Sequence, residues 1–452
     1  MKISRRLALL LITTWGVIVL TGLATAGATS TPEEIDQPTL AQADSPSVPA
    51  TLAASQAFTS NAVVACMISQ VQQSSVYTYD GQLSGEWPVL VGGEPYTLAT
   101  RNTTSGTPIQ KATQYVYEHM QALSLTVSYH DWTWGYSNRN VIGVLTGRSH
   151  SDEIVLVTAH LDDMPSSGSA PGADDNASGS TGVLVAADIL SQYQFERTLR
   201  FVFFTGEEQG LVGSNYYAQA VKNAGENIVA VYNMDMIAWN SDDTADAATL
   251  WLHTRAPSNP GYAADLAIAG VFTNVVSAYG LSNYLTPTIV ADGESRSDHS
   301  SFWSRGYPAI LAIEAGDDFN ANYHSSNDRL QTLDMAYFTN FVKASVGTAA
   351  HLAHPVEVTG ILTGVVSDAV TFSPIAGAQV KSALCPIYTE TSDAQGIYSL
   401  TLPVGVYSIT ASAPGYWPNT VGGVAVISTT TLGIPLAPVR TIYMPLVFKD
   451  AP

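Results

Sequence analysis

The sequence has few of the features that several classes of protein require. It has only two cysteines, Cys66 and Cys385, in 452 residues, so a framework of disulfides is not what stabilises the fold. A single long-range bridge between the two remains open. Basic residues are also scarce, since 18 Lys and Arg stand against 38 Asp and Glu, for a formal charge of −20. Because no basic stripe is available to neutralise phosphates, we expect no nucleic-acid partner.

Long apolar runs are absent apart from one at the N-terminus. Lys2, Arg5 and Arg6 precede that run, and small residues from Ala24 to Ala28 follow it, which is the layout of a secretory signal peptide. We therefore predict a signal peptide at residues 1–28 and a secreted, extracellular protein without membrane contact after cleavage. An uncleaved anchor is the alternative, because the run is almost long enough to span a bilayer.

Changes of composition divide the rest of the chain. At 452 residues it is too long for one ordinary core, so we expect at least two domains. Residues 29–56 are rich in Thr, Ser, Pro and Ala, which predicts a linker or a pro-segment. We place a first domain at residues 57–354, a second at residues 356–438 and a strand-like tail at residues 439–452.

Between residues 57 and 354, apolar runs of strand length alternate with amphipathic segments of helix length. The clearest runs are Ile154–His160, Leu199–Thr205 and Ala309–Glu314, and a polar loop follows each of them. This alternation predicts an α/β fold, with a mostly parallel central sheet and helices on both faces. Ligands of such sheets bind at the carboxyl ends of the strands.

The pattern changes after residue 354, where no helical period is visible. Residues alternate between apolar and polar in four segments, and turn residues separate them: Val358–Val366, Gln379–Ala383, Gly396–Leu402 and Val406–Ala411. This alternation predicts a small all-β sandwich as the C-terminal domain.

Five candidate metal ligands stand at or near the ends of the predicted strands: His160, Asp175, Glu208, Asp235 and His324. Some have an ordinary explanation, such as helix capping for Asp175 or a solvated loop for Glu208. Asp235 is harder to explain so, because an acid between Met234 and Met236 is partly buried and needs a partner. Together the five favour metal binding. Five nitrogen and oxygen ligands exceed the four of a structural site and suit two ions, with zinc favoured.

Two further acidic residues lie next to these ligands. Asp162, two residues after His160, is placed to hold the imidazole nitrogen that faces away from a metal. Glu207 adjoins Glu208, and neighbouring side chains at a strand end diverge. Glu207 can therefore face a bound water as a base while Glu208 binds metal.

The sequence around these residues resembles the motif blocks of the di-zinc aminopeptidases. That family includes secreted bacterial leucyl aminopeptidases and relatives of the glutamate carboxypeptidases. The matching blocks, in chain order, are AHLD at 159–162, GADDNASG at 172–179, FTGEEQG at 204–210, NMDM at 233–236, SDH at 297–299 and YHSSND at 323–328. The resemblance covers about residues 58–352 and implies a zinc exopeptidase-like fold. The predicted sandwich resembles the carboxypeptidase regulatory-like modules of secreted hydrolases.

The resemblance implies which metal each ligand holds. His160 and Asp235 would bind one zinc ion, and Glu208 and His324 would bind the other. Asp175 would bridge the two ions, because the family ligand lies four residues before the Gly that begins the helix.

The resemblance also implies the roles of the residues that bind no metal. Glu207 would be the general acid and base, Asp162 would orient a ligand histidine, and Tyr323 would help to polarise the substrate carbonyl. Asp174 would be a neighbour of the bridge without being a ligand. Asp163 stands where the family often has a small polar residue, and we expect it to alter the rim of the site.

These residues predict a secreted metallo-aminopeptidase that hydrolyses the N-terminal bond of peptide substrates with a water activated by two zinc ions. A carboxypeptidase or dipeptidase of the same family is an alternative, with Arg296 as its obvious basic candidate. A single-zinc glutaminyl cyclase is a weaker one, because it would not need all five ligands. The last is a non-catalytic binding protein on this scaffold, with the sandwich contacting a surface or a glycan, but an intact Glu207 argues against it.

Overall fold

The computed structural model describes residues 58–165, 168–241, 249–356, 358–383, 385 and 388–439. The predicted signal peptide and the linker or pro-segment, residues 1–56, lie outside the described residues, as does the tail from residue 440. Among the helices of the described part, none is both long and apolar enough to cross a membrane.

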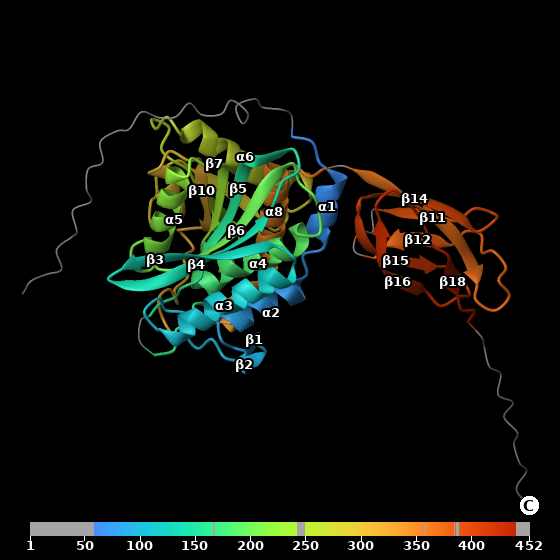
Figure 1. Cartoon of the computed structure of the whole chain (residues 1–452), viewed down its shortest axis with the longest axis horizontal. Helices are drawn as coiled ribbons and strands as arrows, with labels where there is room; N and C mark the ends of the chain where they lie inside the picture. The colour runs from blue at the N-terminus through green and yellow to red at the C-terminus, as the bar shows by residue number, and fades with distance from the viewer. Residues whose placement is uncertain are drawn as a thin grey trace, which may run out of the picture. The chain divides into compact units, whose positions relative to one another are not determined.

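An eight-stranded sheet forms the centre of the region before residue 356 (Figure 1). Its strands are β3 (Thr126–Trp134), β4 (Tyr136–Leu145), β5 (His150–His160), β6 (Arg197–Phe204), β7 (Asn227–Met234), β8 (Thr249–His253), β9 (Thr286–Val290) and β10 (Ala309–Glu314). Their order across the sheet is β3-β4-β6-β5-β7-β10-β8-β9. The four central strands β6, β5, β7 and β10 run parallel, whereas β3 and β4 form an antiparallel hairpin at one edge.

Helices cover both faces of this sheet. One face carries α1 (Ala62–Ser69), α2 (Gln73–Leu83), α3 (Thr107–Ala122), α4 (Gly179–Leu190), α6 (Tyr262–Ala278) and α8 (Met335–Ala353). The other carries α5 (Val212–Asn223) and α7 (His299–Trp303). Strand β5 is apolar throughout because it contributes to both cores: Val155 and Val157 lie in the first, and Ile154 and Leu156 in the second. The predicted α/β fold with a mostly parallel sheet is confirmed.

Shorter elements complete this region. A small hairpin is formed by β1 (Val89–Val91) and β2 (Glu94–Tyr96). The loop between β5 and α4, here called the acidic loop, contains the irregular turn η2 (Ala173–Ser178), which leads directly into α4. The short turn η3 (Leu330–Thr332) precedes α8. The acidic loop is thereby held between the end of a central strand and the start of a buried helix.

In the part of the chain after residue 358 that the structure describes, strands are the only regular elements. One sheet has β14 (Ile397–Pro403), β11 (Thr359–Asp368), β17 (Thr429–Thr431) and β18 (Ile434–Leu436), and the other has β13 (Thr389–Thr391), β12 (Gln379–Ser382), β15 (Gly405–Ser412) and β16 (Asn419–Val426). Inward side chains of both sheets, such as Leu362, Val380 and Ile409, form a separate apolar core. The predicted C-terminal β-sandwich is confirmed.

The two cysteines are bonded to each other. A disulfide links Cys66 of α1 to Cys385, which follows β12, across a sequence separation of 319 residues. The long-range bridge that the sequence left open is therefore present. In the chain-entropy model of disulfides, closing so long a loop stabilises the folded chain by about 6 kcal/mol.

Candidate metal centre

The carboxyl edge of the central sheet brings the five candidate ligands together. His160 is the last residue of β5, and Asp235 directly follows β7. Glu208 lies in the loop after β6, His324 in the loop after β10, and Asp175 in η2. The residues that follow four parallel strands thus lie at one place, which is why candidate ligands so distant in sequence come together.

The two histidines face one carboxylate. His160 Nε2 lies 3.3 Å from Asp175 Oδ1, and His324 Nε2 lies 3.1 Å from Asp175 Oδ2. Each histidine also meets a second carboxylate: His160 Nε2 is 3.2 Å from Asp235 Oδ1, and His324 Nε2 is 3.0 Å from Glu208 Oε2. Asp175 therefore presents one oxygen to each of two histidine–carboxylate pairs.

These donor atoms lie close enough together to hold a metal ion. His324 Nε2 and Glu208 Oε1 are buried and have no hydrogen-bond partner within the described residues, although His324 Nε2 lies close to two carboxylates. Imidazole and carboxylate donors without thiolate fit zinc. Ligand atoms converge in two sets, His160 with Asp175 and Glu208, and His160 with Glu207 and Asp235.

The charges of the centre alter the ionisation of its members. Burial raises the pKa of Glu208 to about 8, and the Asp175 carboxylate adds to this. Burial alone would lower the pKa of His324, but the adjacent carboxylates of Asp175 and Glu208 raise it to about 10. Burial alone would raise the pKa of Asp175, whereas His160 and His324 lower it to about 2. So many buried carboxylates are costly without cations, and divalent ions would relieve that cost.

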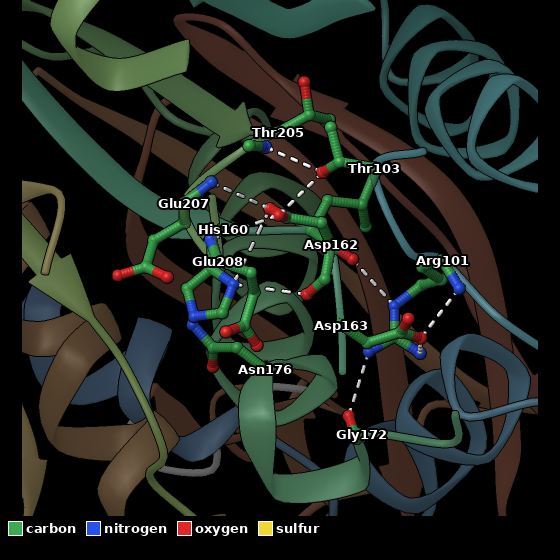
Figure 2. A network of polar contacts seen from close by, with 12 residues as sticks. Arg101, Thr103, His160, Asp162, Asp163, Gly172, Asn176, Thr205, Glu207 and Glu208 are labelled. Atoms are coloured by element: carbon green, nitrogen blue, oxygen red, sulfur yellow. Dashed lines mark hydrogen bonds and ion pairs between the residues drawn. The ribbon is translucent and has the colours of Figure 1, made fainter. Parts of the chain in front are cut away.

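Asp162 holds the turn that carries both glutamates. Its carboxylate accepts hydrogen bonds from the backbone N–H groups of Glu207 and Glu208, both at 3.3 Å, and from Thr103 Oγ1 at 2.7 Å (Figure 2). His160 Nδ1 lies 3.8 Å from Asp162 Oδ1 but 3.2 Å from the Asp162 backbone carbonyl. The carbonyl is therefore the nearer partner of the imidazole. The carboxylate also fixes the turn after β6, which the sequence did not indicate.

A buried arginine ties the acidic loop to the end of β5. Arg101 is fully buried, and its guanidinium donates to the carbonyl oxygens of Leu161 at 2.8 Å and Gly172 at 2.9 Å. It also lies 3.5 Å from the carboxylate of Asp163, which accepts from the Arg101 backbone N–H at 2.7 Å (Figure 2). The expectation that Asp163 stands at the rim is wrong, because its side chain is fully buried against Arg101.

Asp174 uses its oxygens within the fold. Asp174 Oδ1 accepts from the Ala238 backbone N–H at 2.9 Å, and Oδ2 accepts from Asn320 Nδ2 at 3.0 Å. Asp328 accepts from the backbone N–H groups of both Asp174 and Asp175, each at 3.0 Å. These bonds turn Asp174 into the protein and leave Asp175 to face the histidines.

Two residues of the later motif blocks complete the site. The Tyr323 ring stacks on His324 with centroids 3.6 Å apart. Burial and the carboxylates of Asp175 and Glu208 raise the pKa of Tyr323 far above its usual range, so its hydroxyl stays protonated and can donate. Ser297 Oγ donates to Asp235 at 2.6 Å, a contact that sequence reasoning missed although the SDH block pointed to this segment.

Comparisons with known proteins give a family match for each of the two regions. The model of the family described as Peptidase family M28 matches residues 140–348, and that of the carboxypeptidase regulatory-like domain matches residues 361–437. A probable leucine aminopeptidase of Arthroderma benhamiae is 30% identical over 270 residues, covering 57% of this chain and 69% of the relative. A probable zinc metalloprotease of Pyrenophora tritici-repentis is 26% identical over 309 residues, covering 58% and 64%. The Legionella pneumophila LapA aminopeptidase structure shares the fold, with a TM-score of 0.53 at 22% identity, covering 65% of this chain and 75% of that one.

Proposed function

Because the chain belongs to peptidase family M28, we propose that it is an exported aminopeptidase that binds two zinc ions and hydrolyses the N-terminal bond of peptides. The observation that carries the proposal is Asp175, which presents one carboxylate oxygen to each histidine. A carboxylate so placed can bridge two ions. His160 with Asp235 would complete one zinc site, and His324 with Glu208 the other.

The chemistry divides between the metals and the chain. Bound zinc would supply Lewis acidity, which polarises the scissile carbonyl and lowers the pKa of the attacking water. The Glu207 carboxylate accepts the proton of that water and then delivers it to the leaving amine. Asp162 keeps the backbone of Glu207 in place through the N–H of that residue. The protonated hydroxyl of Tyr323 donates to the carbonyl oxygen as negative charge develops there.

The basic candidate for a substrate carboxyl end is badly placed, which favours the amino end of a peptide. Arg296, the basic candidate for a carboxypeptidase, is 88% exposed at its side chain and is held by Glu294, with Nη2 and Oε2 2.6 Å apart. A guanidinium that is both solvated and already paired makes a poor anchor for a substrate carboxylate.

The test is a comparison of substrates that differ only in their termini. Purified protein loaded with zinc would be incubated with leucinamide, N-acetyl-leucinamide and an N-acetylated dipeptide with a free carboxyl end. We expect hydrolysis of leucinamide alone. Cleavage of the acetylated dipeptide instead would establish the carboxypeptidase alternative, and no cleavage of any substrate would favour a binding protein.

Export is supported by the sequence of residues 1–28 and is tested separately. The chain would be expressed in full, and the N-terminus of the protein recovered outside the cells would be sequenced. We expect a mature chain that begins near Gly27 or Thr29. A product that keeps residues 1–28 and stays with the membrane would contradict this part of the proposal.

A further inference from the structure

The β3–β4 hairpin extends past the end of β6 (Figure 1), and Glu207 lies in the turn that follows β6. Strand β4 pairs with β6 up to Val141, which lies opposite Phe203. The earlier residues of β4 continue beyond β6, where the Arg139 carbonyl accepts from Thr205 Oγ1 at 3.0 Å. The tip of the hairpin therefore stands at the same edge of the sheet as the metal centre.

Trp132 fixes the hairpin to that turn. Its side chain is buried, and Nε1 donates to Thr205 Oγ1 at 3.1 Å. Gly206, which has a φ of +80°, lies directly under the ring, since a Cβ added there would be 2.9 Å from the indole. Glu207 is the next residue. The hairpin consequently has a defined position relative to the group that handles the proton.

Aromatic rings continue outward from Trp132. The Tyr136 ring packs against Trp132 and Trp134, with centroids 5.6 and 6.4 Å apart. Tyr216 of α5 lies 6.4 Å from Trp132 by the same measure, and its hydroxyl donates to the carbonyl of Thr133. Trp134 is 49% exposed and Tyr216 is 42% exposed. Trp134, Tyr136 and Tyr216, which the Trp132 ring links, therefore form a partly exposed aromatic surface, the hairpin patch.

Such a surface is available to a ligand. Adjoining exposed aromatics are uncommon on a solvated surface and mark binding sites. The hydroxyl of Tyr136 is buried and has no hydrogen-bond partner within the described residues. Burial and the Asp162 carboxylate raise the pKa of Tyr136, so this hydroxyl stays protonated and can donate a hydrogen bond.

The position of Glu207 indicates which part of a substrate reaches the patch. Because Glu207 returns its proton to the leaving amine, the leaving peptide begins beside Glu207 and continues outward. An extended peptide advances about 3.3 Å per residue, so its next few residues pass along the hairpin. We propose that the hairpin patch is the subsite for the leaving part of the peptide and selects apolar or aromatic side chains among the second to fourth residues. This inference rests on the proposed aminopeptidase function.

The experiment measures a preference within one set of peptides. Leu-Gly-Gly-Gly-amide would be compared with the three peptides in which Trp replaces one Gly, and leucinamide would serve as the reference substrate. We expect at least one Trp peptide to exceed the Gly peptide by about 3- to 10-fold in kcat/KM, mainly through KM, as aromatic contacts of ordinary strength imply. In Trp134→Ala and Tyr216→Ala, the kcat/KM for the Trp peptide divided by that for the Gly peptide should fall to about 1.

Matched controls separate recognition from structure. Tyr284→Ala removes an aromatic side chain of similar exposure, 50%, near β9 at the opposite edge of the sheet, and should keep the Trp preference. Tyr216→Phe deletes only the hydroxyl that donates to the carbonyl of Thr133, so this variant should keep most of the preference for the Trp peptide. An equal loss on leucinamide and on the Trp peptide in Trp134→Ala would overturn the inference, because it would show a structural effect. A wild-type enzyme that cleaves leucinamide but does not distinguish the four peptides would overturn it too, and would leave the aminopeptidase proposal standing.

Discussion

The carboxyl edge of the central sheet, here called the metal edge, and the β-sandwich differ in how their polar side chains are buried. Along β11 of the sandwich, buried and more exposed side chains alternate, and its buried Asp368 accepts the backbone N–H groups of Val370 and Thr371 in a turn. At the metal edge, carboxylates such as Asp162 and Asp175 are buried side by side. Charge of one sign is concentrated there at a cost to the fold, which is expected only where chemistry requires it.

Replacement of the bridging carboxylate should have the largest effect. Asp175→Asn removes the charge that faces both histidines, so we expect metal content to fall from about two equivalents per chain and hydrolysis to reach background. Removal of metal from the wild type by a chelator should do the same, and added zinc should restore the wild type alone. Metal analysis and leucinamide hydrolysis measure both.

Asp174→Asn is the matched control for that substitution. It places an amide where Asp174 accepts from Ala238 and Asn320, so we expect a loss of about 1–3 kcal/mol in the free energy of unfolding, with metal content retained. If Asp174→Asn released the metals while Asp175→Asn kept them, the assignment of the bridge would be wrong by one residue.

The next largest effect is expected at Glu207. Glu207→Gln keeps the size of the side chain but removes the proton acceptor, and kcat should fall by about 10²- to 10⁴-fold with zinc retained. Glu208→Gln should lose zinc as well as rate, because it removes a ligand charge. Zinc analysis and kinetics on the two variants decide the matter, and near-normal turnover of Glu207→Gln would rule out this mechanism.

A loss of folding stability is expected from a change at the buried Arg101–Asp163 pair. Arg101→Met leaves the Asp163 carboxylate buried without its partner, which typically costs about 3–5 kcal/mol. It also frees the carbonyls of Leu161 and Gly172, so the acidic loop should bind zinc more weakly. Urea unfolding and a zinc titration measure these effects.

The double variant Arg101→Met with Asp163→Leu tests the cause. Replacing both partners by apolar residues should recover much of the lost stability, but zinc binding should stay weakened because the loop carbonyls remain unanchored. Additive losses in the double variant would mean that the two side chains act independently.

The sequence predicted the parts of the molecule that are specified locally. Strands such as β5 and β10 are predicted because their runs are apolar enough to be buried on two faces, and the candidate ligands stand out because they follow such strands. The helices α1 and α2 were missed: α1 is apolar nearly all round and α2 has only a weak apolar face, so neither shows a clear helical period. The five-residue α7 is too short to show one.

The unpredicted parts of the site are contacts between distant residues. Arg101 meets Gly172 and Ser297 meets Asp235 across 71 and 62 residues, and no local pattern in one sequence marks such a pair. The acidic loop shows both cases at once. The identity of Asp175 as the residue facing the histidines agrees with its motif spacing, whereas the burial of Asp163 depends on an arginine that only the fold brings near.

The smallest effect on catalysis is expected from removal of the sandwich. All candidate ligands precede residue 354, and the sandwich has an apolar core of its own, so a chain that ends at Val356 should keep its metals. Because Cys66 would lose Cys385, the truncated chain should carry Cys66→Ser. We expect its kcat/KM for leucinamide to stay within about two-fold of the full chain.

The thermal midpoint of the truncated chain should be compared with that of full-length Cys66→Ser, which lacks the bridge but keeps the sandwich. A truncated chain that folds but loses zinc would show that the sandwich supports the metal site. The two regions would then not differ in whether they contribute to catalysis.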